Sequence, residues 1–143
     1  TEAEEKQIMK LMAHTGARIE LKPVVEPAAI FELRRLVDQI HVDEQISDYI
    51  IRLVFATRDA DRLLPDMKGM IRFGGSPRAS INLNLAARAH ALLQGRAHVT
   101  PMDVKSIAMD VLRHRIITTF EAEAEDVTSE KIVQHLLEKV PVP

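Results

Sequence analysis

The sequence contains no cysteine and no tryptophan, and aromatic residues make up only 3% of its 143 positions. The absence of cysteine excludes disulfides, thiol catalysis and cysteine-based metal sites. With so few aromatic residues, the core has to be built from Leu, Ile, Val, Met and Ala, which favours packed helices over a β-sandwich. A chain of this length is expected to form one ordinary domain with a buried core.

Neither an excess of one charge nor a long apolar run is present. The 19 basic and 21 acidic residues leave a net charge of −2, so we expect no nucleic-acid partner. No apolar run approaches the length of a membrane span and no signal peptide is visible, so we expect no membrane insertion and a cytoplasmic location. The chain begins abruptly in helical sequence, however, and a targeting segment could have preceded it.

The six histidines include no pair at i, i+4 spacing, so no metal site is expected.

Apolar residues recur at helical spacing in six segments of the chain. Mostly short links join these segments, so the sequence predicts an all-α helical bundle of about six helices. A β-prone run between Ile116 and Phe120 predicts at most a very short extended segment. Residues 59–73 include Pro65 and Gly69 and are expected to be irregular. The longest expected helix runs from Pro77 to Gln94, and its expected inward face is Ile81, Leu85, Ala89 and Leu92.

The most informative stretch is Gly74-Gly75-Ser76-Pro77-Arg78, which reads as a glycine hinge followed by a helix start. Ser76 is a favoured N-cap, whose hydroxyl can accept a hydrogen bond from a free N–H of the first turn. Pro77 suits the first helical position, where no donor is needed. Replacing Ser76 by alanine is therefore expected to cost about 1 kcal/mol of stability.

Arg78 has two interpretations. A cation in the first turn lies at the positive end of the helix dipole, which disfavours it by about 0.3–1 kcal/mol. Such a residue can hold an anion, because free N–H groups and a guanidinium converge on one spot. The alternative is an exposed arginine that simply extends into water.

Five motifs, in this order, resemble the C-terminal lid of MoxR-type AAA+ ATPases. The resemblance covers nearly the whole chain. It includes the Gly-Ala-Ser-Pro-Arg motif, an alanine-rich helix, a Gly-Arg turn, a Val-Thr-Pro helix start and a Leu-x-His-Arg-Ile segment. The matching residues are Gly74 to Ser80, Ala86-Ala87-Arg88-Ala89, Gly95-Arg96, Val99-Thr100-Pro101 and Leu112-Arg113-His114-Arg115-Ile116. Gly75 stands where the family usually has Ala, which should loosen the hinge slightly.

The resemblance implies a role for Arg78. In that family the arginine of the Ser-Pro-Arg motif is the sensor-2 residue, which reaches from the lid to the γ-phosphate of ATP. Gly74, Gly75, Ser76 and Pro77 would support this residue at the helix start. The resemblance further implies a chaperone-like remodelling ATPase that uses ATP and Mg²⁺. It also implies a homo-oligomeric ring, expected to be a hexamer, and von Willebrand factor A domain proteins as partners.

The chain itself has no Gly-x-x-x-x-Gly-Lys-Ser/Thr loop, so these residues alone are not expected to hydrolyse ATP. We expect residues 1–16 to be the last helix of the AAA+ core of the same chain, and residues 17–143 to be the lid. Two alternatives remain open. One is a free-standing all-α protein-interaction module without a nucleotide role. The other is a DNA-associated module with histone-fold-like helices, against which the near-neutral charge counts.

Overall fold

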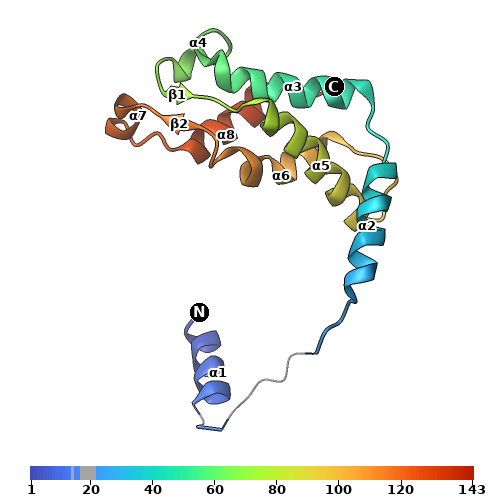
Figure 1. The fold of residues 1–143 in the computed structure, drawn as a ribbon. Coiled ribbons are helices and arrows are strands. Elements are labelled where there is room, and N and C mark those ends of the chain that lie inside the picture. Colours follow the sequence, from blue (N-terminus) through green and yellow to red (C-terminus); the bar gives the residue numbers. More distant parts are fainter. Residues whose placement is uncertain (14, 17–21) are drawn as a thin grey trace. The chain divides into compact units, whose positions relative to one another are not determined.

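The structure is a computed structural model, and it describes residues 1–13, 15–16 and 22–143 (Figure 1). It divides into two compact units, Thr1–Phe31 and Glu32–Pro143. The boundary expected after residue 16 adjoins residues 17–21, which lie outside the described part, as does His14. Helix α2 (Pro27–Gln39) carries residues of both units.

Helix α1 (Glu2–Met12) begins with a side-chain cap. Thr1 and Glu4 form a capping box, in which the Thr1 hydroxyl accepts from the Glu4 backbone N–H. The helix ends at Met12, ahead of Gly16. Its apolar side chains are exposed, and Leu11 is 68% exposed.

The second unit is helical apart from one small sheet, as the sequence predicts. Its longer helices are α3 (Glu44–Arg58), α5 (Pro77–Leu93), α6 (Pro101–Leu112) and α8 (Ser129–Lys139). The shorter elements are α4 (Ala60–Leu63), the 3-10 turn η1 (Pro65–Met67), β1 (Ile71–Phe73), β2 (Ile117–Thr118) and α7 (Phe120–Ala124). Figure 1 shows α5 between α3 and α6, and α5 packs most extensively against α6.

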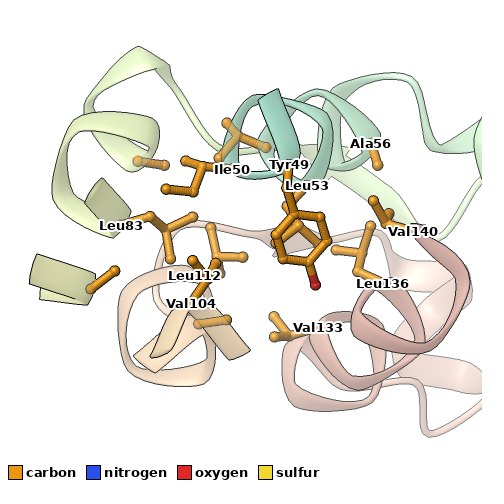
Figure 2. Close-up of a cluster of buried hydrophobic side chains, with 14 of the residues drawn as sticks. Tyr49, Ile50, Leu53, Ala56, Leu83, Val104, Leu112, Val133, Leu136 and Val140 are labelled. Atoms are coloured by element: carbon orange, nitrogen blue, oxygen red, sulfur yellow. The ribbon is translucent and has the colours of Figure 1, made fainter. Parts of the chain in front are cut away.

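The core is aliphatic around a single tyrosine. Tyr49 and Leu53 of α3 are fully buried, as are Leu112 of α6 and Leu136 of α8. Figure 2 shows the Tyr49 ring within this cluster, beside Leu136 and Val133. The aliphatic core expected from the composition is therefore confirmed.

The inward face of α5 differs from the expected one. Ile81 is 57% exposed and Leu85 is 46% exposed, whereas Leu83 is fully buried. The buried residues of α5 form a stripe with a four-residue spacing: Ala79, Leu83, Ala87 and Ala91. Small side chains let α5 approach α6 closely, so Ile81 and Leu85 do not face inward as expected, whereas Leu92 packs against the core.

Residues 59–73 are more regular than expected. They form α4, η1 and β1, and β1 pairs antiparallel with β2. The short extended segment expected near Ile116 is confirmed as β2. Its partner strand was missed because the pairing joins segments far apart in sequence, which no local pattern reveals.

Candidate functional site at the start of helix α5

The sequence places the start of α5 correctly. The helix begins at Pro77, and Ser76 is its N-cap, with extended backbone angles of φ −78° and ψ 172°. Proline fits here because its fixed φ suits the first turn and its missing N–H is not needed. Arg78 therefore lies in the first turn of a helix of 17 residues.

The capping role expected for the Ser76 hydroxyl is wrong. This hydroxyl makes no capping hydrogen bond. The Ala79 backbone N–H, which a capping hydroxyl would bind, instead donates to the Ser76 carbonyl at 2.8 Å. The Ser76 carbonyl already accepts from this N–H, so the Ser76 side chain contributes little to the helix start.

The Ser76→Ala change is accordingly expected to alter stability by less than about 0.5 kcal/mol, within the usual range for surface substitutions. Thermal melts of the chain would measure this. A loss of about 1 kcal/mol, typical of a removed N-cap, would show that the hydroxyl caps α5 in solution. Thr128→Ala is the matched comparison, because the Thr128 hydroxyl does accept from the Lys131 N–H, at 3.3 Å.

The two glycines before α5 are required by close packing. A Cβ at Gly74 would lie 2.3 Å from the Thr57 carbonyl oxygen and 2.6 Å from its Oγ1. A Cβ at Gly75 would lie 3.1 Å from that of Ala79. Residue 74 therefore has to be glycine, because the Thr57 backbone occupies the space that a Cβ would need. An alanine at residue 75 would need only a small adjustment of its neighbours.

Thr57 anchors this segment. Its hydroxyl is buried, donates to the Val54 carbonyl at 2.6 Å and accepts from the Gly75 N–H at 2.7 Å. The start of α5 is thereby fastened to the last turn of α3. Thr57 was not singled out as a site residue from the sequence. No local pattern indicates this contact, because Thr57 and Gly75 lie 18 residues apart.

Arg78 extends from this anchored turn as an exposed side chain. Within the described residues its guanidinium has no hydrogen bond and no ion pair, and the first turn of α5 contains no acidic residue. The positive end of the helix and the guanidinium therefore combine into an electropositive point. Since Pro77 lacks an N–H and that of Ala79 is already bonded, the side chain is the main donor available to an anion.

A second polar cluster lies at the turn from α5 to α6. Asp103 is fully buried and accepts from Arg96 Nη1 at 2.7 Å, from the Thr100 hydroxyl at 2.7 Å and from the Thr100 N–H at 2.7 Å. His90 Nδ1 lies 2.6 Å from the same carboxylate. The Arg96 guanidinium, with further hydrogen bonds, holds the pKa of Asp103 well below its usual range. These donors occupy the carboxylate, so the cluster is structural.

Several known proteins resemble this chain in sequence. The profile of the AAA lid domain family matches residues 66–136, which include Arg78 and the Asp103 cluster. The chain belongs to the AAA lid domains of the MoxR family. It is 36% identical to Chaperone MoxR1 of Mycobacterium tuberculosis over 141 residues, or 98% of this chain and 37% of that protein. It is also 39% identical over 82 residues to Protein MoxR of Paracoccus denitrificans, covering 54% of this chain and 23% of that protein.

A solved structure extends the likeness to three dimensions. A putative ATPase from Cytophaga hutchinsonii superposes with a TM-score of 0.91 at 34% identity, covering all of this chain and 44% of that one. The chain thus spans less than half the length of these relatives. The described part of this lid contains no cluster of three potential metal ligands. It also contains no helix long and apolar enough to cross a membrane.

Proposed function

We propose that this lid domain senses nucleotide through Arg78, which contacts the γ-phosphate of ATP held by an AAA+ core outside these residues. The observation that carries the proposal is the Arg78 guanidinium, which has no partner among the described residues and extends from an anchored helix start. Bound ATP would supply the phosphoryl group to be transferred. Arg78 would place a planar cation where negative charge redistributes during that transfer.

The anchoring at Thr57 gives this contact a mechanical consequence. Because Gly75 is bonded to Thr57 and Gly74 packs on its carbonyl, the Arg78 backbone cannot move far without moving α3 and α5 together. Loss of the γ-phosphate would remove the contact and release the whole lid from one orientation. Nucleotide state and lid angle would thus be coupled through a rigid body.

The proposal extends to the whole protein. The phosphate loop and the Mg²⁺ ligands would belong to the core, with residues 1–16 as its last helix and residues 17–143 as the lid. The protein would assemble as a homo-oligomeric ring, a hexamer in our proposal. It would work in the cytoplasm as a chaperone-like remodelling ATPase, with von Willebrand factor A domain proteins among its partners.

The proposal is tested by comparing the affinities of the full-length protein for ATPγS and for ADP, measured by calorimetry. Replacing Arg78 by alanine is expected to weaken ATPγS binding about tenfold, because one charge-assisted contact to the γ-phosphate is lost. Binding of ADP, which has no γ-phosphate, should be unchanged.

Arg113→Ala is the matched control, since it removes another exposed arginine of the lid, on the C-cap of α6. It should leave both affinities unchanged. An equal loss for ATPγS and ADP in the Arg78 variant would contradict a γ-phosphate contact. Unchanged affinity for both would favour the interaction-module alternative.

A further inference from the structure

A pocket of about 290 Å³ opens where the outer face of α3 meets the end of α8. Its floor is apolar and its rim is cationic. The apolar lining comes from Phe55, Ala56, Val140 and Pro141. The rim comes from Arg52, Arg62 and Lys139. Phe55 is 52% exposed, so part of its aromatic ring faces solvent.

The surroundings of this pocket favour a partner with carboxylates. No acidic residue lines it. The Arg58 guanidinium lies 4.3 Å from the centre of the Phe55 ring and adds a fourth cation beside the rim. Arg62 pairs with Asp59 and Lys139 with Asp66, whereas Arg52 and Arg58 form no ion pair with any described residue. An apolar group flanked by acidic residues would therefore match both the floor and the rim.

The same chain presents such a group on α7. Phe120, its first residue, is 80% exposed, and the acidic residues beside it are exposed as well: Glu121, Glu123, Glu125 and Asp126. None of these carboxylates forms an ion pair within the described part of the chain. The preceding Thr119 fixes the segment, because its N–H donates to the Met70 carbonyl at 3.1 Å and its hydroxyl to the Gly69 carbonyl at 2.8 Å.

We propose that α7 of one copy docks into this pocket on a second copy of the chain, with Phe120 on the apolar floor and its acidic neighbours against the rim. Phe120 and Phe55 both remain exposed in the single copy, so neither covers the other within one chain. The contact joins two different surfaces, so each pair keeps one free pocket and one free α7. Such a head-to-tail contact propagates into a closed ring or an open chain.

Sedimentation velocity on the 143-residue chain over a wide concentration range tests the contact. The wild-type chain is expected to self-associate as concentration rises, and added salt should weaken the association. Phe120→Ala should raise the dissociation constant at least about tenfold, as expected for a central aromatic anchor. Leu93→Ala is the matched control, because Leu93 is equally exposed at 81% and lies at the end of α5; it should change nothing.

A charge exchange separates this contact from nonspecific adhesion. The double change Arg52→Glu with Lys139→Glu reverses two charges of the rim, and Glu121→Arg with Glu123→Arg reverses two charges of α7. Each variant alone should associate much more weakly than the wild-type chain, because attractive charge contacts become repulsive ones. An equimolar mixture should associate again, since each rim then meets an α7 of opposite charge.

A wild-type chain that stays monomeric at every concentration would overturn the proposal. So would a mixture that does not recover association while circular dichroism shows both variants folded, or a Phe120→Ala chain that associates like wild type. Because the experiment contains no nucleotide and leaves Arg78 unchanged, its failure would not affect the proposed nucleotide-sensing role.

Discussion

Replacing Arg78 by alanine in the full-length ATPase is expected to lower the rate of ATP hydrolysis on the order of 10²–10³-fold, the usual effect of removing one positioned donor from a transition state. The expected loss is in kcat, because the guanidinium would matter most when charge redistributes on the γ-phosphate. Steady-state kinetics with saturating ATP would measure it.

The fold should respond differently from the activity. Arg78 has no partner among the described residues and lies at the positive end of α5. Its removal should therefore leave the stability of the 143-residue chain unchanged or raise it by about 0.3–1 kcal/mol. A destabilised chain together with normal turnover in the full-length protein would mean that Arg78 is a structural ion-pair partner.

The conservative variant sharpens this test. Arg78→Lys keeps the positive charge but loses the planar fork of donors, so it should recover only part of the hydrolysis rate. Full recovery would indicate that a point charge suffices. No recovery at all would indicate that the geometry of the guanidinium carries the effect.

Asp103→Ala is expected to cost about 3 kcal/mol of folding stability, near the lower end for breaking a buried ion pair. The loss is limited because the side chains of Arg96 and His90 are 31% and 29% exposed and can turn toward water. The Thr100 N–H, however, loses its acceptor, and α6 loses its capping box. Thermal melts should show a midpoint lowered by about 10 °C for a domain of this size.

Asp110→Ala provides the matched control on the same helix. Asp110 is exposed and pairs with Arg113 at 3.2 Å, so its removal should cost less than about 0.5 kcal/mol. An Asp103 variant no less stable than the Asp110 variant would show that the buried cluster adds nothing to the fold.

The same cluster predicts how stability depends on pH. The pKa of Asp103 is lower in the folded chain than its ordinary value of 3.8, so below that value the unfolded chain takes up the proton first. The stabilisation from Asp103 is therefore fully present above the ordinary pKa and is lost as the pH falls below it. Denaturant midpoints at neutral and acidic pH should show a smaller acid loss in Asp103→Asn than in the wild-type chain.

Local sequence determined where the helices begin and end. The Thr1 capping box, Pro27, Asp43 and Pro77 all stand at helix starts, and Gly95, with φ +70°, follows the end of α5. These features act within one turn of the chain, through side-chain caps and fixed backbone angles. Nearby residues therefore suffice to predict them. The position of Arg78 in a first turn followed from the same local chemistry.

Tertiary structure alone decided which surfaces meet. Nothing near Gly74 in sequence indicates that its backbone lies against Thr57, and nothing near Ile71 indicates that β1 pairs with β2. The buried face of α5 is the stripe of Ala79, Leu83, Ala87 and Ala91, because its three alanines let α6 pack close to α5. Such contacts depend on the distance between segments far apart in the chain, and a periodic pattern within one segment does not contain that distance.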